Sequence, residues 1–372
     1  MLGGFMVVAG FIAILMLHEG GHLVAAKAFG MKATKYFLGF GPTLWSFQRG
    51  ETEYGIKAFP AGGYVRIIGM NPLEEVPPED EDRAYRARPF LQKAVVVMAG
   101  IATHFVLAFV LLWVANVVVG EPDRNLPQLE IAYVVSQTDD GSPTAAVLAG
   151  IEPGDRVLAV DGVSVTSWSE LTSILKVHPN QHILLEVERH GERLHLSVTL
   201  TARIDPNTGE EQGFLGVSPH IGRSRDNPIL GIGTAAGDVV LFTRQSARGI
   251  WAFVTNFGSF IRAVFGNNEV LDEVRPVSVI GITQFGAASQ RAGFNFTLEL
   301  IAYISVFLGV VNAIPLYPLD GGHFAVALYE KVTGRQADMH KLVPLGAMVF
   351  FLLLLVGILG MYFDIVRPLD LG

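Results

Sequence analysis

The sequence contains no cysteine. A disulfide framework is therefore excluded, and a zinc site could use only histidine and carboxylate ligands. Charged side chains are also scarce, because Asp, Glu, Lys and Arg make up only 17% of the 372 residues, against about 25% in soluble domains. Hydrophobic residues make up 50% of the chain, and the mean hydropathy is +0.41. These values predict a membrane protein.

Basic residues form no stripe along the chain, and the formal net charge is −8. Nucleic-acid binding proteins usually carry a clustered basic patch. We therefore expect a lipid bilayer, and no nucleic acid, as the surroundings of this chain.

Four stretches are long and apolar enough to cross a bilayer, which takes about 20 mostly apolar residues. They are residues 1–27, 94–119, 300–319 and 342–363. The first stretch has no charged n-region and leads directly into His18 without a small-residue cleavage site, so we interpret it as a span rather than a cleaved signal peptide. The sequence thus predicts a polytopic α-helical membrane protein with four transmembrane helices.

The short loops set the predicted orientation, because cytoplasmic loops carry an excess of Lys and Arg. Residues 27–93, between the first two spans, hold ten basic residues, and the loop between the last two spans holds Lys331, Arg335 and Lys341. The two chain ends carry almost no basic charge. We therefore expect both basic loops in the cytoplasm, and both termini with the long insert between spans two and three on the outside.

The sequence divides into four parts. Residues 1–120 form an N-terminal membrane domain, 127–203 an α/β domain, 204–295 a linker with amphipathic segments at the membrane surface, and 296–372 a C-terminal membrane domain. The α/β domain shows alternating strand patterns and two helix candidates. Expected strands are 129–135, 151–161, 183–188 and 193–201, and expected helices are 142–149 and 168–176. Residues 228–265 are apolar but interrupted by glycines and charges, which favours surface segments over a fifth span.

An H-E-x-x-H sequence, His18-Glu19-Gly20-Gly21-His22, stands at the end of the first span. On a helix, residues four positions apart share a face, so both imidazoles can reach one metal ion. Glu19 is offset by one position and can act as general base on a water that zinc activates. Ionisable residues at membrane depth are costly and usually functional, which favours a metal site over three interfacial polar residues. The two glycines either make room for substrate or allow close helix packing.

A third ligand must come from elsewhere, because a catalytic zinc takes three protein ligands and a water. Asp320 is the candidate, since it follows a proline-broken segment at the predicted cytoplasmic end of the third span, where irregular backbone implies burial or a cavity. An ordinary Asp-Gly turn is the alternative. Rival ligands are Glu19, Glu299 and His323.

Other polar residues lie within the spans. Asn312 lies two turns inward of Asp320, and it either donates a hydrogen bond to an oxyanion or joins two helices. His104 and Asn116 of the second span have no evident partner in the sequence, and we interpret them as packing residues.

The chain resembles the site-2 protease family of intramembrane metalloproteases, specifically the bacterial regulator-of-sigma-factor type with a single PDZ domain. Five segments carry the resemblance, in the family's order and over nearly the whole chain. They are HEGGH at 18–22, GFGP at 39–42, FPAGGYVRIIGM at 59–70, the PDZ-like IEPGDRVLAVDG at 151–162 and NAIPLYPLDGGH at 312–323. Tyr317 stands where a common form of the last motif has a proline.

The resemblance implies that His18, His22 and Asp320 bind Zn²⁺ and that Glu19 is the catalytic base. It gives Asn312 a role in positioning the substrate or the transition state. The implied fold combines the four transmembrane helices with a membrane-associated β-hairpin region and one α/β PDZ-like extracytoplasmic domain.

The β-hairpin region falls in residues 34–70, where 37–47 and 54–68 alternate as aromatic-rich strands. Four glycines are expected at its turns, namely Gly39, Gly41, Gly62 and Gly63. The resemblance places these strands in the membrane near the zinc. A free strand edge there could pair with an unwound substrate by strand addition.

The function implied by the resemblance is a zinc endopeptidase of the bacterial inner membrane. It would cleave single-span membrane proteins, such as trimmed anti-sigma factors or remnant signal peptides, in regulated intramembrane proteolysis. The PDZ-like domain would filter substrates by size, bind peptide, or serve as a spacer. A non-catalytic PDZ-based scaffold and a metal transporter stay open as alternatives, although a scaffold needs neither Glu19 nor Asp320 and a transporter usually shows repeated half-structures. The sequence predicts no oligomeric state.

Overall fold

The computed structural model describes residues 2–71, 74–122, 129–138, 141–204, 210–219, 223–265, 278, 281–285 and 294–366. The chain divides into two compact units. We call Met1–Val119 with Asp226–Gly372 the membrane unit, and Gly120–Arg225 the insert domain.

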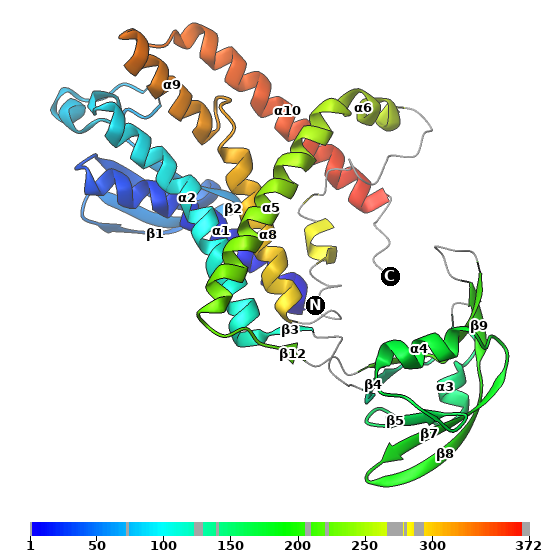
Figure 1. Cartoon of the computed structure of the whole chain (residues 1–372). Coiled ribbons are helices and arrows are strands. Elements are labelled where there is room, and N and C mark those ends of the chain that lie inside the picture. The colour runs from blue at the N-terminus through cyan, green and yellow to red at the C-terminus, as the bar shows by residue number, and fades with distance from the viewer. Residues whose placement is uncertain are drawn as a thin grey trace. The chain divides into compact units, whose positions relative to one another are not determined.

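In the described part of the membrane unit, four helices are long and apolar enough to cross a bilayer (Figure 1). They are α1 (Leu2–Ala28), α2 (Phe90–Val114), α8 (Phe294–Asn312) and α10 (Met339–Val366). The four predicted spans are thus confirmed. The predicted end of the third span at Leu319 is wrong, because α8 stops at Asn312 and the prolines that follow cannot continue a helix. A separate helix, α9 (Asp320–Thr333), begins after this break.

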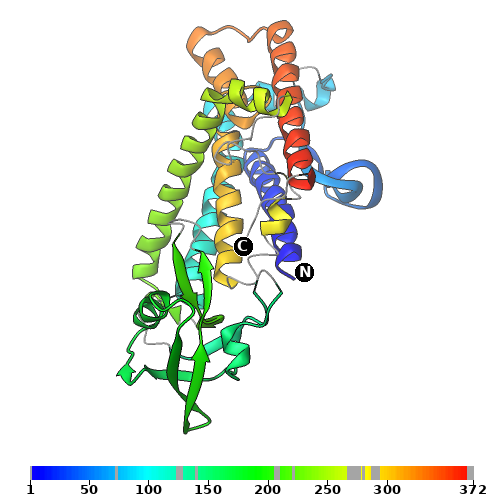
Figure 2. The same cartoon turned by 90° about the vertical axis from the view of Figure 1, so that its right-hand side faces the viewer.

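Helices α1, α2 and α8 pack side by side, as two views of the membrane unit agree (Figures 1 and 2). Val7 and Ile14 of α1 are fully buried against Ile301 and Ile304 of α8. Close approach also depends on Gly21, because a Cβ there would lie 2.7 Å from the carbonyl oxygen of Ala99 on α2. Of the two roles open for the motif glycines, the structure supports helix packing for Gly21.

Residues 228–265 form two helices, α5 (Leu230–Thr255) and α6 (Phe257–Phe265). Helix α5 runs along α2 and α8 (Figure 2), and its Ala235 is buried in a cluster with residues of both. Its charged Asp238 accepts a hydrogen bond of 3.1 Å from Asn116 Nδ2, in the π-helical turn Ala115–Val119 that extends α2. Asn116 therefore has a partner that the sequence did not reveal. The remainder of the predicted segment 204–295 lies partly outside the described residues.

Two long strands, β1 (Ala33–Arg49) and β2 (Thr52–Ile67), follow α1 and fold back on themselves. Tyr36 pairs with Val65 on one side and with Tyr54 on the other. The two strands reverse direction near the predicted glycine turns, because residues 35–38 run parallel to residues 53–56 whereas residues 45–49 run antiparallel to them. Gly39, Gly41 and Gly62 have positive φ at these reversals, while Gly63 pairs with Leu38 and Gly50 stands at the hairpin turn. Gly39 has a φ of 86° and lies against the carbonyl group of Phe59, so it permits a close backbone approach at an irregularity of the sheet.

One part of this sheet is rich in exposed apolar side chains. They are Phe40, Leu44, Trp45, Phe47, Ile56 and Phe59, which are 43% to 69% exposed. A contiguous apolar surface of this kind marks a membrane or partner contact.

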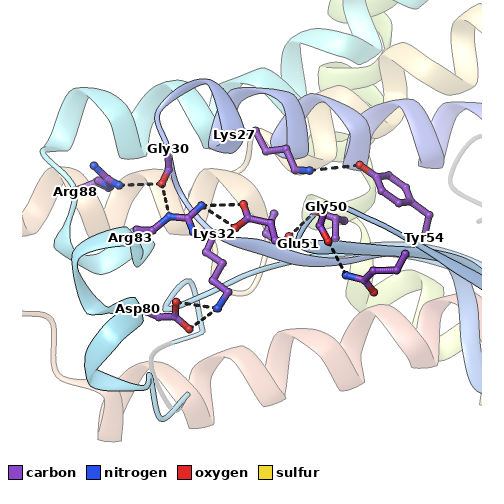
Figure 3. A network of polar contacts seen from close by, with 12 residues as sticks. Lys27, Gly30, Lys32, Gly50, Glu51, Tyr54, Asp80, Arg83 and Arg88 are labelled. Carbon is purple, nitrogen blue, oxygen red and sulfur yellow. Dashed lines mark hydrogen bonds and ion pairs between the residues drawn. The ribbon is translucent and has the colours of Figure 1, made fainter.

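A polar network fixes the opposite end of the sheet to the chain that leads into α2 (Figure 3). Lys32 Nζ lies 2.6 Å from an oxygen of the buried Asp80, in the short helix Pro78–Arg83. Arg83 binds Glu51 at the hairpin turn at 2.8 Å and also donates to the carbonyl oxygen of Gly30. Arg88 donates to the same carbonyl oxygen at 3.1 Å. These contacts hold the base of the sheet against the end of α1.

The insert domain is built on a four-stranded antiparallel sheet with the order β6-β5-β7-β8. Its strands are β5 (Arg156–Val160), β6 (Val163–Ser164), β7 (His182–Arg189) and β8 (Glu192–Thr199). Helices α3 (Ala145–Leu148) and α4 (Trp168–Lys176) accompany the sheet. Alternate residues of β7, such as Ile183, Leu185 and Val187, enter one core with Leu171 of α4.

Three two-stranded pairs complete the insert domain. They are β4 (Ile131–Val134) with β11 (Val217–Pro219), β9 (Thr201–Ile204) with β10 (Glu211–Phe214), and β3 (Glu121–Pro122) with β12 (Arg223–Ser224). The unit contains the predicted α/β domain of residues 127–203 and extends it at both ends.

Candidate metal centre

Helix α1 presents His18 and His22 on one face, four positions apart. Their side chains are almost buried, and their Nε2 atoms lie 3.2 Å apart. Asp320 Oδ2, from the start of α9, lies 3.3 Å from Nε2 of His18 and 3.2 Å from Nε2 of His22. The three atoms form a nearly equilateral triangle, and they are the one such group that the described residues contain.

This triangle fits a zinc ion in size and chemistry. A tetrahedral zinc with ligands at about 2.0 Å has ligand atoms about 3.3 Å apart. The buried Asp320 Oδ2 makes no hydrogen bond to any described residue. His22 Nδ1 donates to the carbonyl oxygen of Val96 at 2.8 Å, which leaves the lone pair of Nε2 for a metal.

The backbone around Asp320 is shaped by its two neighbouring glycines. A Cβ at Gly321 would overlap the carbonyl groups of Ala313 and Ile314, and a Cβ at Gly322 would overlap the backbone of Tyr317. The chain after α8 therefore folds tightly against the first turn of α9. Asp320 reaches the two histidines from this turn.

Helix α9 is itself held against the beginning of α2. Lys93 Nζ lies 3.3 Å from Glu330 Oε2, and the rings of Phe90 and Phe324 have centroids 6.0 Å apart. Helix α9, which carries Asp320, and helix α1, which carries the two histidines, thus both pack against α2.

Glu19 lies beside the triangle without belonging to it. Its Oε2 accepts a hydrogen bond of 2.9 Å from the backbone N–H of Val65 on β2. The rival ligands Glu299 and His323 are not part of the three-atom group either. Glu299 instead accepts a hydrogen bond from Asn295, and the ring of His323 lies 5.0 Å from that of Tyr317.

The strand that contacts Glu19 also borders a hollow of about 690 Å³. Residues 64–67 of β2 form one wall, Tyr317 and His323 contribute to its lining, and Glu74 and Glu75 also line it. Residues 63–67 pair with residues 33–38 of β1, and no other strand in the described part of the chain pairs with them. A strand edge and a hollow therefore meet at Val65, the residue that contacts Glu19.

His104 is the residue of this region that sequence reasoning misjudged. Its ring centroid lies 4.7 Å from that of His18, and its Nε2 lies 3.5 Å from Asn312 Nδ2. The interpretation as a packing residue is therefore incomplete. The sequence did contain one indication of a functional role for His104, because it is an ionisable side chain in the middle of an otherwise uncharged span.

The arrangement defines a class of protein. Two histidines of an H-E-x-x-H helix and one remote carboxylate share a buried point, and a glutamate stands beside them. These are the residue types that metallopeptidases use as metal ligands and base, and here they lie inside a bundle of membrane helices.

Comparison with known proteins agrees with this class. The family model described as peptidase family M50 matches residues 6–356. The zinc metalloprotease Rip1 of Mycobacterium bovis is 32% identical, with 97% of each chain covered. Rip1 of Mycolicibacterium smegmatis is 33% identical, with 93% of this chain and 91% of that protein covered. A putative zinc metalloprotease of Nostoc sp. is 31% identical, with 94% and 92% covered.

Among solved structures, the PDZ domain of an SdrC-like protein from Listeria monocytogenes matches 24% of this chain and 88% of that domain, at 20% identity and a TM-score of 0.20. The chain belongs to peptidase family M50, the site-2 protease family, and is a multi-pass intramembrane zinc metalloprotease.

Proposed function

We propose that His18, His22 and Asp320 bind the zinc ion and that Glu19 is the catalytic base. The triangle of ligand atoms supports the first assignment, and the place of Glu19 one position beyond His18 supports the second. Zinc supplies the Lewis acidity that activates water and polarises a peptide carbonyl. Glu19 takes the proton of the attacking water and delivers it to the leaving amine. Asn312 donates a hydrogen bond from its amide to the oxygen that becomes negative.

The substrate, in this proposal, is an extended segment of a membrane protein. A helical peptide bond is shielded by its own hydrogen bonds and must be unwound before water can attack it. The free edge of residues 63–67 can pair with the unwound segment by strand addition, and the hollow beside it can take substrate side chains. The observation that carries this proposal is the contact of the same edge, at Val65, with Glu19.

The substrate class follows from size and surroundings. Single-span membrane proteins, such as anti-sigma factors already trimmed outside or remnant signal peptides, have one short apolar helix to unwind. The basic loops support a cytoplasmic side for the zinc end of α1 and an external side for the insert domain and both termini. The PDZ-like insert domain would then exclude substrates that retain large external parts.

The two rival functions make different predictions. A scaffold would bind partners without cleaving them, and a transporter would release its metal readily. A buried triangle with both histidine rings almost enclosed favours a resident ion over a transported one.

The test is a cleavage assay with the purified protein in detergent micelles, on a tagged single-span anti-sigma factor trimmed on its external side. We compare wild type with Glu19→Gln and Asp320→Ala and measure zinc in each. Glu19→Gln should retain zinc and lose at least about 100-fold in cleavage rate, and Asp320→Ala should lose both zinc and cleavage. A wild type that binds zinc but leaves several such substrates intact would sink the substrate proposal. Cleavage that persists in Glu19→Gln would remove Glu19 from its role.

A further inference from the structure

His104 lies on α2, a helix that supplies none of the three ligand atoms, and its side chain is only 1% exposed. Burying an imidazole without partners is costly. The groups that contact the His104 imidazole therefore indicate the role of this side chain.

A stripe of α8 surrounds His104 on one side. Ser305 Oγ donates to the backbone carbonyl of His104 at 2.9 Å and lies 3.5 Å from its Nδ1. A Cβ at Gly309 would lie 2.9 Å from the Cβ of His104, so the absence of a side chain there makes room for the imidazole. One turn further, Asn312 Nδ2 lies 3.5 Å from His104 Nε2.

These contacts determine which nitrogen of the His104 ring donates a hydrogen bond and which accepts one. The hydroxyl proton of Ser305 is given to the carbonyl oxygen, so its oxygen is left to accept a hydrogen bond from Nδ1–H of His104. A neutral imidazole with its proton on Nδ1 has an acceptor at Nε2. Nε2 then accepts one hydrogen of the Asn312 amide, and the second amide hydrogen stays free for another acceptor.

The opposite side of the ring faces the metal centre. The rings of His104 and His18 have centroids 4.7 Å apart and an interplanar angle of 31°. One buried side chain thus contacts a ligand candidate on α1 and the amide at the end of α8. Asn312 precedes the broken segment that returns to Asp320. His104 contacts Asn312 at one end of this segment, and His18, which His104 also contacts, lies 3.3 Å from Asp320 at the other end.

We propose that His104 is a positioning residue. It orients the Asn312 amide toward the reacting carbonyl and supports the ring of His18 from behind. This inference rests on the role proposed above for Asn312.

The test uses binding as well as turnover. The probe is a peptide hydroxamate, whose zinc-binding oxygens stand in for those of the reacting peptide, added to the full-length zinc-loaded protein in micelles. The variants are His104→Phe, Asn312→Ala and the double variant. Phe keeps an aromatic ring against His18 but has no nitrogen. Zinc content and resistance to a chelator should match wild type in His104→Phe.

The hydroxamate Kd should rise about tenfold in His104→Phe and by the same factor in Asn312→Ala, with no further rise in the double variant. For cleavage, kcat should fall about 10- to 100-fold at unchanged KM, because the amide acts on the transition state. A matched control is Asn116→Leu, which removes another buried, hydrogen-bonded side chain of the same helix. It should lower thermal stability and leave Kd and kcat unchanged.

Unchanged hydroxamate binding in His104→Phe, or effects that multiply in the double variant, would overturn the inference. So would an equal loss in Asn116→Leu, since that indicates a general packing effect. Should His104→Phe fail to fold, His104→Gln and His104→Leu replace it, and only Leu should weaken binding, because Gln keeps an acceptor. If wild type binds zinc and hydroxamate but cleaves no substrate, the proposed function fails while the binding comparison still decides the role of His104.

Discussion

The two compact units bury a carboxylate in opposite ways. In the insert domain, Asp155 is fully buried and accepts hydrogen bonds from Arg189 Nε at 2.6 Å, from an Arg189 Nη at 2.7 Å and from the N–H of Glu152 at 2.9 Å. In the membrane unit, Asp320 Oδ2 meets two imidazole nitrogens and makes no hydrogen bond to a described residue. One carboxylate has its cation in the chain, and the other faces a point where a cation fits.

This difference in partners distinguishes a carboxylate that stabilises the fold, Asp155, from one that serves a functional site, Asp320. A buried carboxylate is tolerated only when it is paired or binds a metal. Asp155 is paired with Arg189 within the insert domain. Asp320 and the two histidines meet at a buried point between packed helices, where a bound cation would offset the charge of the carboxylate.

A substitution on α2 can disturb the metal centre of the membrane unit without changing any of the three candidate ligands. A Cβ at Gly100 would overlap the ring of His22 at Nε2, so Gly100→Ala must displace that ring. We expect zinc affinity to fall by at least about 10- to 100-fold, as when the support of a ligand is lost, and cleavage to fall with it. Zinc retention during dialysis against graded chelator measures the effect.

The matched control is Gly237→Ala in α5, where an added Cβ meets nothing within 4 Å. It should leave zinc affinity unchanged and favour the helix by about 1 kcal/mol. Zinc binding by Gly100→Ala at the wild-type level would show that His22 does not occupy the position described.

Sequence reasoning succeeded where the signals are local. Helix α4 was predicted and found at Trp168–Lys176, because Ser167 caps it by accepting from the N–H of Glu170 at 3.2 Å. The strands predicted at 183–188 and 193–201 were likewise found as β7 and β8, and His190 and Gly191 between them have positive φ. The spacing of His18 and His22 predicted their shared face in the same way.

Sequence reasoning failed where a feature depends on a distant segment. The partners of His104 are on α8 and that of Asn116 is on α5, some 200 and 120 positions away, and no periodicity reveals such pairs. Gly39, Gly41 and Gly62 have the positive φ that a turn requires, but the sequence did not reveal that both strands reverse there and pair a second time. The broken segment and the predicted topology made Asp320 the candidate for the third ligand, but an ordinary Asp-Gly turn fitted the local sequence equally well, and the family resemblance decided between the two.

In the insert domain, a substitution of Asp155 removes the buried ion pair with Arg189. Asp155→Ala leaves the guanidinium of Arg189, only 20% exposed, without its main partner. We expect the insert domain to lose about 3 kcal/mol of unfolding free energy, with zinc content unchanged. Urea unfolding can be followed by the fluorescence of Trp168, in a variant in which the other three tryptophans are phenylalanine.

A control for the loss of charge is Glu186→Ala, which removes the partner of Arg193, a side chain that is 74% exposed. That change should cost less than about 1 kcal/mol. Equal effects of the two substitutions would contradict the structural role given to the Asp155–Arg189 pair.

The smallest expected effect is a dependence of insert-domain stability on acid pH. Burial pushes the pKa of Asp155 upward, but the hydrogen bonds and charge of Arg189, with the N–H of Glu152, outweigh it and hold the pKa below its usual value. The folded carboxyl therefore binds its proton less readily than the unfolded one, whose pKa is about 3.9. The contribution of Asp155 is complete above that unfolded value and is lost as pH falls through the lower folded pKa.

Urea unfolding at successive pH values from about 5 to 3 measures this loss, with a slope of at most about 1.4 kcal/mol per pH unit for a single group. The Asp155→Ala variant should lack that part of the slope, because it has no carboxyl to protonate. If wild type and variant lose stability in parallel over this range, other carboxyl groups control the acid response and the Asp155–Arg189 pair does not.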